Sequence, residues 1–173
     1  MAKDLQEFTK NALTQNPDAP ISIYTDGACK GNPGVGGWGA LILVGKEEIE
    51  VSGYEAMSTN NRMEMMAAIG ALRLLPNDFG KERGITLYTD SQYLQQGITS
   101  WISNWKKNNW QTAEKRPVKN IDLWQELDFF CDMFQLEWKW IRGHAGHYYN
   151  EFVDGLAQNA IIAYKIATQE RPS

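Results

Sequence analysis

The order in which strand-like and helix-like segments follow one another restricts the fold of this chain more than any other sequence feature. Residues 21–28 alternate apolar and polar side chains and are rich in β-branched residues, a pattern typical of a strand, which we expect to end at Asp26-Gly27. A glycine-rich turn then leads into strand-like segments at 38–44 and 48–54. Three successive strands joined by short turns predict an antiparallel meander.

After this meander the periodicity changes from that of strands to that of helices. Apolar residues recur at helical spacing from Thr59, with Thr59 or Asn60 as the N-cap. A short apolar run at 85–89 then predicts a strand, and helical segments follow it at 91–98 and 101–107. A strand followed by a helix is the repeating unit of a parallel strand pair.

The last third of the chain continues this alternation, with a helix at 120–134, a strand at 136–141 and a helix at 150–167. The whole order predicts the α/β class: a mixed five-stranded sheet, with three antiparallel and then parallel strands, flanked by helices. We expect the folded domain to span residues 21–168. Residues 1–20 are expected to be a flexible N-terminal extension that can include a short helix.

Length and composition narrow the class of protein. A chain of 173 residues with a hydrophobic fraction of 43% suits one globular domain. No apolar run approaches the roughly 20 residues that cross a bilayer, and the first 20 residues lack the apolar core of a secretion signal. Cys29 and Cys131 are far apart and indicate neither a disulfide framework nor a soft-metal site. We therefore expect a cytoplasmic monomer with reduced thiols and no membrane partner.

The charges are distributed unevenly along the chain. The net charge of −4 argues against a generally basic nucleic-acid binder. Residues 101–120, however, hold five basic residues against one acid, and the remainder of the chain carries −8. Part of that deficit comes from acids near predicted strand ends and helix starts, which repel one another unless cations neutralise them.

Two aspartates follow predicted strands in the same local pattern. Tyr-Thr-Asp occurs at 24–26 and again at 88–90, which places Asp26 and Asp90 just past the ends of two strands. Ligands bind at this edge of an open α/β sheet, because the loops after neighbouring parallel strands converge there. A single aspartate in such a position is more often a turn former or a helix cap. Two in the same pattern are hard to attribute to unrelated caps, so we expect them to meet at one site.

Two further acids are expected at the same edge of the sheet. Glu64 and Asp154 are predicted in the first turns of their helices, where a lone acid would only complement the helix dipole. The four carboxylates together form a set of hard oxygen ligands without cysteine, which selects Mg²⁺ or Mn²⁺ over Zn²⁺. Two such ions about 3.5 to 4 Å apart activate a water and stabilise the leaving oxygen of a phosphodiester. The pattern therefore predicts a hydrolytic, divalent-metal site.

Five segments of the chain carry a resemblance to a known family. In chain order they are TDGACKGNPGVGGWGA from Thr25, TNNRMEMMAA from Thr59, TDSQYLQQGITSWISNWKKNNW from Thr89, RPVKNIDLW from Arg116 and IRGHAGHYYNEFVDGLA from Ile141. Single segments are weak signals, whereas the set in this order is specific and covers most of residues 21–165. The chain resembles the bacterial type 1 ribonucleases H. The resemblance implies a ribonuclease H-like fold and an endonuclease that hydrolyses the RNA strand of RNA/DNA hybrids, leaving 5′-phosphate and 3′-hydroxyl ends.

The resemblance also implies roles for individual residues. The family's metal-binding carboxylates fall on Asp26, Glu64, Asp90 and Asp154, with two Mg²⁺ ions as cofactors in the presence of substrate and Mn²⁺ as an alternative. His144, the first histidine of GHAGH, takes the position of the family's catalytic histidine, and an imidazole suits proton relay near neutral pH. His147 is better explained as an ordinary surface or core residue.

Further residues are implied to contact the RNA/DNA hybrid. Those on the RNA side of the minor groove are Cys29, Asn32, Asn60, Asn61 and Gln92. Those on the DNA strand are Tyr93, Trp101 and Trp105, which pack against deoxyriboses, and Thr59 and Asn120, which hold a phosphate. Residues 101–120 resemble the family's basic handle, in which Lys106 and Lys107 grip the duplex backbone. Without the resemblance, the aromatic residues would be interpreted as helix core and the lysines as a solvated face.

Three positions depart from the family pattern. Asn108 and Gln111 stand where related handles commonly carry basic residues, so we expect weaker backbone affinity that is lost at lower salt. Met57 stands where the family often has arginine, next to the residues implied to hold the DNA phosphate.

Two other function classes compete with a hybrid-specific nuclease. The first is a catalytically silent binder of hybrid or double-stranded RNA, against which the intact carboxylate set argues. The second is a nuclease or integrase of the same superfamily that acts on DNA, which the basic handle and the Asn60-Asn61 pair disfavour. Cleavage assays on RNA/DNA, RNA/RNA and DNA/DNA duplexes, with Mg²⁺ and with chelator, separate the three.

Overall fold

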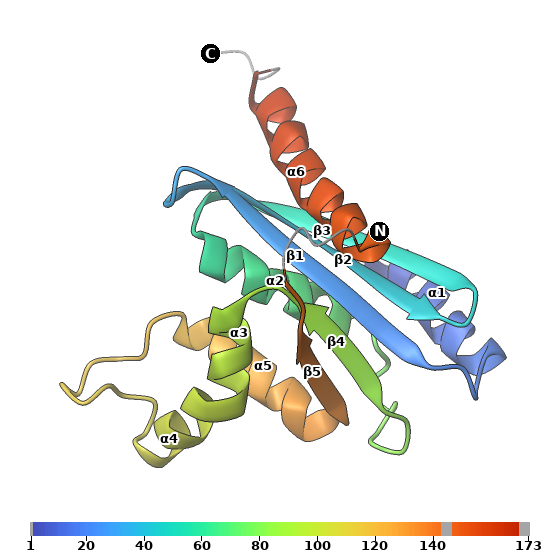
Figure 1. Ribbon diagram of the computed structural model, residues 1–173, viewed down its shortest axis with the longest axis horizontal. Coiled ribbons are helices and arrows are strands. Elements are labelled where there is room, and N and C mark those ends of the chain that lie inside the picture. The colour runs from blue at the N-terminus through green and yellow to red at the C-terminus, as the bar shows by residue number, and fades with distance from the viewer. Residues whose placement is uncertain (1, 143–146, 170–173) are drawn as a thin grey trace.

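A computed structural model describes residues 2–142 and 147–169 of the chain. One sheet runs through the molecule, and helices flank it (Figure 1). The strands are β1 (Ile21–Lys30), β2 (Gly34–Val44), β3 (Glu47–Ser58), β4 (Ile85–Thr89) and β5 (Leu136–Trp140). The helices are α1 (Ala2–Gln15), α2 (Asn60–Leu72), α3 (Gln92–Gln96), α4 (Ile102–Lys107), α5 (Ile121–Met133) and α6 (Tyr148–Gln169), with a five-residue π-helix η1 (Gly97–Trp101) between α3 and α4.

The sheet has the predicted mixed topology. Its strands lie in the order β3-β2-β1-β4-β5. β1, β2 and β3 pair antiparallel as a meander, while β4 pairs parallel with both β1 and β5. The predicted fold class is therefore confirmed, and the two parallel pairs bring the ends of β1, β4 and β5 to one edge.

Helices pack on the sheet from two sides because the strands alternate. A side chain at Gly36 would meet Met63 of α2, whereas one at the next residue, Gly37, would lie 2.3 Å from the Ala157 carbonyl oxygen of α6. Successive residues of a strand point to opposite faces, so α2 and α6 cover opposite faces of β2. The backbone of α6 approaches so closely at Gly37 that no side chain fits there.

Helix α2 is the most buried helix of the core. The Thr59 side chain accepts a hydrogen bond from the Arg62 backbone N–H (3.2 Å), which confirms the predicted N-cap. Nine of the thirteen residues of α2 are buried, because α2 lies between the sheet and α5. Its position is therefore fixed by packing along most of its length.

The N-terminal segment forms a longer helix than the sequence indicates. Helix α1 runs from residue 2 to residue 15, and its Thr9, Ala12 and Leu13 are buried. Arg83 donates to the carbonyl oxygens of Leu13, Asn16 and Ala19, which lie at and beyond the end of α1. A cation at a helix C-terminus satisfies the free carbonyls and complements the dipole. No local pattern could indicate this anchor, because Arg83 is 64 to 70 residues away in sequence. The domain boundaries at 20 and 168 stay a prediction.

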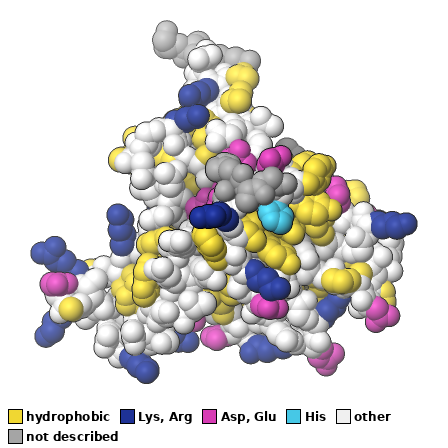
Figure 2. Space-filling view, in the orientation of Figure 1, with side chains coloured by type: hydrophobic (Ala, Val, Ile, Leu, Met, Phe, Trp, Pro, Cys, Tyr) yellow, Lys and Arg dark blue, Asp and Glu magenta, His cyan; other side chains and the backbone are white. Residues whose placement is uncertain are grey.

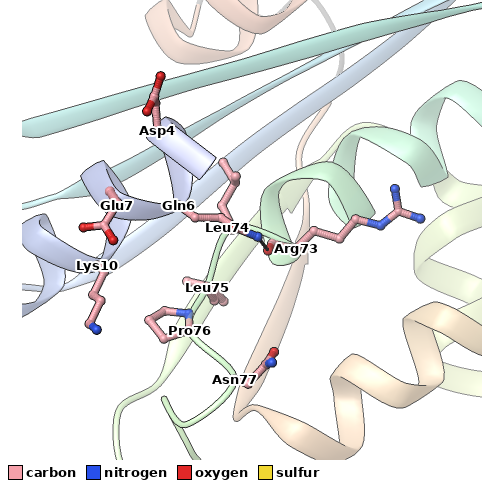
Figure 3. A pocket seen from close by; sticks show the side chains of 9 residues that line it. All are labelled: Asp4, Gln6, Glu7, Lys10, Arg73, Leu74, Leu75, Pro76 and Asn77. Carbon is pink, nitrogen blue, oxygen red and sulfur yellow. Dashed lines mark hydrogen bonds between the residues drawn. The ribbon is translucent and has the colours of Figure 1, made fainter. Parts of the chain in front are cut away.

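A hollow of about 400 Å³ is lined by α1 and the segment that follows α2 (Figure 3). Its lining residues are Asp4, Gln6, Glu7, Lys10, Arg73, Leu74, Leu75, Pro76 and Asn77. It lies beyond the C-terminal end of α2, whereas Glu64 lies near the N-terminal end. The hollow is therefore separate from the predicted carboxylate site. Within the described ranges, no helix is long and apolar enough to cross a bilayer.

The Arg83 anchor generates the first testable prediction. Replacing Arg83 by Met removes the hydrogen bonds to three carbonyls, so the chain should lose about 1 to 3 kcal/mol of unfolding free energy. Urea unfolding measures that loss, and limited proteolysis should show faster cleavage within residues 2–20. Glu82→Met, at an exposed neighbouring position, serves as the control. Equal stability and equal proteolysis of Arg83→Met and the parent would contradict the anchor.

Candidate active site

The two Tyr-Thr-Asp segments lie side by side in the sheet. Tyr24 of β1 pairs with Tyr88 of β4 in parallel register, and their rings stack with centroids 4.5 Å apart. Asp26 and Asp90 each follow two residues later, so they emerge at the same edge, as predicted. One detail of the prediction is wrong: Asp26 lies within β1 rather than past its end. The reason is that β1 continues to pair with β2 as far as Lys30 after β4 has ended.

The chain after Asp90 is held by side-chain hydroxyls. The Ser91 N–H donates to Thr89 Oγ1 (3.1 Å), and Ser91 Oγ accepts from the Leu94 N–H (3.1 Å) as the N-cap of α3. The Trp140 indole N–H donates to the Asp90 carbonyl oxygen (3.0 Å). These bonds fix the backbone on which the Asp90 carboxylate stands.

Gly27 joins Asp26 to Glu64. Its backbone N–H donates to Asp26 Oδ1 and to Glu64 Oε1, both at 2.9 Å. A Cβ at position 27 would lie 2.4 Å from the Met63 carbonyl carbon and 2.5 Å from the Glu64 nitrogen, so only glycine lets α2 approach this closely. Glu64 is the fifth residue of α2, which makes the prediction of a first-turn position wrong. The helix starts after the Thr59 cap, and Glu64 therefore lies in the second turn.

Asp26, Glu64 and Asp90 form a tight group. Each offers a carboxylate oxygen, and these oxygens all lie within 4.8 Å of one another. Asp26 is 4% exposed and Glu64 is 8% exposed, while Asp90 is partly exposed. Glu64 Oε2 is buried and no group of the described residues donates to it, although the Glu64 and Asp26 carboxyls lie within hydrogen-bonding range of each other. A buried carboxylate oxygen without a donor is costly, and a cation would satisfy it.

Asp154 reaches the same group from α6. Its carboxylate lies within hydrogen-bonding range of the Asp26 carboxyl. It is not part of the group whose oxygens all lie within 4.8 Å. The predicted first-turn position is wrong here too: Asp154 is the seventh residue of α6, which begins at Tyr148, two residues earlier than expected. The structure thus brings all four predicted acids to one edge, with Asp154 at its margin.

The crowding raises the pKa of the two buried acids. Burial raises the pKa of Asp26 to about 7, and the negative charges of Asp90 and Asp154 act in the same direction. Burial also raises the pKa of Glu64 well above its usual value, with Asp26 as the next cause. Two buried carboxyls in contact cannot both ionise without a counter-charge. Hard oxygens, mutual repulsion and a buried Glu64 oxygen with no donor in the described ranges together fit a divalent cation.

Comparison with known proteins assigns the chain to a family. The family model described as RNase H matches residues 18–162. The chain belongs to the ribonuclease H family. It is 53% identical to the Ribonuclease H of Bradyrhizobium diazoefficiens, with 84% of this chain and 92% of that protein covered. It is 55% identical to the Ribonuclease H of Nitrobacter hamburgensis, with 84% and 94% covered.

Solved structures agree with this ribonuclease H assignment. LC9-RNase H1, a type 1 RNase H with the type 2 active-site motif, is 31% identical and superposes with a TM-score of 0.73. The match covers 84% of this chain and 73% of that chain. LC11-RNase H1 shares the fold, with a TM-score of 0.62 and 24% identity over 84% of this chain and 99% of that one. The predicted resemblance to type 1 ribonucleases H is confirmed.

The residues implied to contact RNA lie around the start of α2. Asn32 Oδ1 accepts from the Asn60 N–H (3.1 Å), which ties the β1–β2 turn to this helix. The Cys29 thiol lies 3.4 Å from the Ser58 carbonyl oxygen at the end of β3. Asn61 is the next exposed residue of α2, and Gln92 is exposed at the start of α3. Their roles stay predictions.

The residues implied to contact DNA form a second group. The Tyr93 ring contacts the Trp101 ring at 5.4 Å, and Trp101 contacts Trp105 at 5.9 Å. These residues are partly exposed and partly packed against the core. The alternative interpretation as helix core therefore holds only in part. Asn120 precedes α5 and donates to the Tyr93 hydroxyl (3.0 Å). Their contacts with substrate stay predictions.

Some predicted residues lie elsewhere. His144 lies outside the described residues. Lys106 is ion-paired with Asp128 of α5 (3.3 Å), while Lys107 is exposed and has no ion pair within the described part of the chain. Met57 is 71% exposed beside the start of α2.

Arg62 is a residue that sequence reasoning missed. It lies inside the TNNRMEMMAA segment, but nothing local indicates its contacts. Its guanidinium bonds to Asp122 at 3.0 and 3.2 Å and to Asn120 Oδ1 at 3.2 Å, about 60 residues away. These contacts join the start of α2 to the start of α5.

The raised pKa of Asp26 predicts a pH-dependent stability. A carboxyl whose pKa is higher in the folded than in the unfolded state stabilises below about pH 4, and that contribution is lost as pH rises through about 7. In chelator, Asp26→Asn should therefore be more stable than the parent by about 1 to 3 kcal/mol at pH 8, and the gain should shrink towards pH 4.5. Urea unfolding at both pH values tests this. A gain that is independent of pH would refute the electrostatic origin.

Proposed function

We propose that this ribonuclease H hydrolyses the RNA strand of RNA/DNA hybrids and leaves 5′-phosphate and 3′-hydroxyl ends. The observation that carries the proposal is the buried group of Asp26, Glu64 and Asp90, in which one Glu64 oxygen lacks a partner among the described residues. The relatives named Ribonuclease H support the activity class. LC11-RNase H1, which shares the fold, was crystallised in complex with an RNA/DNA hybrid, which supports the substrate.

The four acids are proposed to hold two divalent ions, Mg²⁺ in the first place and Mn²⁺ as an alternative. When bound, such ions activate the attacking water and neutralise charge on the scissile phosphate. Glu64 Oε2 and the carboxylates of Asp26 and Asp90 are the inner ligands in this proposal, and Asp154 completes the set at the exposed margin. His144 is proposed to relay a proton.

The backbone around the acids keeps them in place for this task. The Gly27 N–H holds one oxygen each of Asp26 and Glu64, which leaves their other oxygens for a cation. The capped start of α3 holds Asp90. Because these carboxylates are already held in place, little conformational entropy is lost when the ion binds.

A basic surface is proposed to grip the duplex. Figure 2 shows Lys and Arg side chains gathered at the lower left, over α4 and the loop that follows it. This is the proposed handle, residues 101–120, with a net charge of +4. The phosphate backbone supplies most of the affinity of such surfaces, and that part of the affinity falls steeply with salt. A monomer that acts in the cytoplasm is part of the proposal.

Cleavage assays test the activity directly. The chain should cut the RNA of a labelled RNA/DNA hybrid with Mg²⁺, stop in chelator and leave RNA/RNA and DNA/DNA duplexes intact. Asp26→Asn should lower the rate by at least about 10³-fold, because removal of a cation ligand disables the charge stabilisation that dominates such reactions. Glu50→Gln, on exposed β3, is the matched control. Full activity of Asp26→Asn would end the proposed site, and cleavage of DNA/DNA would favour the DNA-acting alternative.

The two handle lysines should differ in their contribution to binding. Lys107 is unpaired within the described part of the chain, whereas Lys106 already faces Asp128. Lys107→Ala should therefore reduce the slope of log affinity against log salt by about one counter-ion, and Lys106→Ala by less. Fluorescence anisotropy with a labelled hybrid in Ca²⁺ measures both slopes. Equal slopes for the two variants would show that the ion pair does not matter.

A further inference from the structure

A chain of hydrogen bonds runs from α2 to α3 through the residue before α5. The Arg62 guanidinium donates to Asn120 Oδ1 (3.2 Å), and Asn120 Nδ2 donates to the Tyr93 hydroxyl oxygen (3.0 Å). The Trp124 indole N–H donates to the same hydroxyl oxygen (3.3 Å). This series of hydrogen bonds therefore has a cation, Arg62, at one end and a phenol, Tyr93, at the other.

The direction of this chain is fixed by chemistry. A guanidinium and an indole N–H donate and cannot accept, so the amide oxygen of Asn120 must face Arg62 and its nitrogen must face Tyr93. The Tyr93 oxygen then accepts two hydrogen bonds, which leaves its own hydrogen for a further acceptor. The described part of the chain provides no acceptor for that hydrogen.

The cation strengthens the donor at the far end. Asp122 raises the pKa of Arg62 by hydrogen bonding, and Glu55 acts in the same direction, so this guanidinium stays charged. It polarises the Asn120 amide, and the amide in turn polarises the Tyr93 hydroxyl, because hydrogen bonds in series reinforce one another. A hydroxyl polarised in this sense is a better donor to an anion than an ordinary phenol.

The hydroxyl is also held in place. Asn120 adopts a left-handed backbone conformation (φ 60°), which its bonds to Arg62 and Tyr93 stabilise. The Tyr93 ring packs against both Trp101 and Trp124, with centroid distances of 5.4 and 5.3 Å. Tyr93 itself is partly exposed. A fixed donor on a partly exposed residue loses little conformational entropy when it binds.

We propose that the Tyr93 hydroxyl donates a hydrogen bond to a backbone phosphate of the bound duplex, with Arg62 as the positioning residue that orients and polarises Asn120. The inference rests on the proposed function. It changes the role of Tyr93 from packing against a deoxyribose to contacting a phosphate. Arg62 also donates its backbone N–H to Thr59 Oγ1 (3.2 Å), so the two residues predicted to hold a DNA phosphate meet at this arginine.

Tyr93→Phe tests the proposal because it removes the hydroxyl and keeps the ring. Binding is measured in Ca²⁺ by anisotropy, with hybrids in which one phosphate at a time is replaced by a neutral methylphosphonate. The variant should bind the normal hybrid about ten-fold more weakly, as for loss of one hydrogen bond to a charged group. At one linkage, the methylphosphonate should weaken binding of the hybrid by the parent and leave binding by Tyr93→Phe unchanged. If the loss of affinity from Tyr93→Phe and the loss from the methylphosphonate multiply at every linkage, the proposal is overturned.

Asn120→Asp is a second variant that keeps the shape of the side chain. Its carboxylate still accepts from Arg62 but also accepts the Tyr93 hydrogen, so the hydroxyl is no longer available to a phosphate. The methylphosphonate that has no effect on Tyr93→Phe should also have a reduced effect on Asn120→Asp. Arg62→Gln should weaken binding of the normal hybrid. The loss of affinity should be smaller for the hybrid that carries the methylphosphonate at this linkage. Unchanged sensitivity to that linkage in Asn120→Asp would overturn the relay.

Two controls separate the possible failures. Tyr54→Phe removes a phenol from an exposed position of β3, far from α5 in sequence, and should bind as the parent does. Thermal unfolding checks that each variant is folded at the assay temperature. A parent that fails to cut hybrids ends the proposed function, whereas a parent that cuts them, with Tyr93→Phe binding equally well, ends this inference alone.

Discussion

The mutual repulsion of carboxylates held closer than 4.8 Å is the constraint on which the rest of the structure depends. Acids in water would separate, so the fold must hold them against that force. The Gly27 N–H does so by donating to two of them, and the close approach of α2 at Gly27 makes this possible. The site is therefore built by packing far more than by any attraction between its members.

This constraint links stability to function. The core around α2 is dense enough to hold two acids with raised pKa, and the metal-free protein carries their cost at neutral pH. A cation that binds the folded form offsets that cost by mass action. The same buried Glu64 oxygen, which no described residue donates to, thus disfavours the ionised acid on its own and favours binding of the ion.

The fold and the four acids could be predicted from sequence because both depend on local patterns. Strand and helix periodicity indicated the mixed sheet, and the repeated Tyr-Thr-Asp indicated two strands that end together. Glu64 and Asp154 lie one turn further into their helices than predicted: the start of α2 was predicted correctly but Glu64 is its fifth residue, whereas α6 begins two residues before its predicted start. Arg83 and Arg62 were missed because their partners lie tens of residues away and leave no local pattern.

Helix α2 connects the carboxylates to the proposed phosphate contact. Glu64 projects from it to the Gly27 N–H, while Arg62, two residues earlier, reaches Asn120. Residues two apart on a helix point in different directions, so one rigid element serves both ends of the site. Nine residues of α2 are buried, so the packing of this helix fixes both contacts. The position of Glu64 relative to the Arg62–Asn120 contact is therefore set by α2, which packs between the sheet and α5.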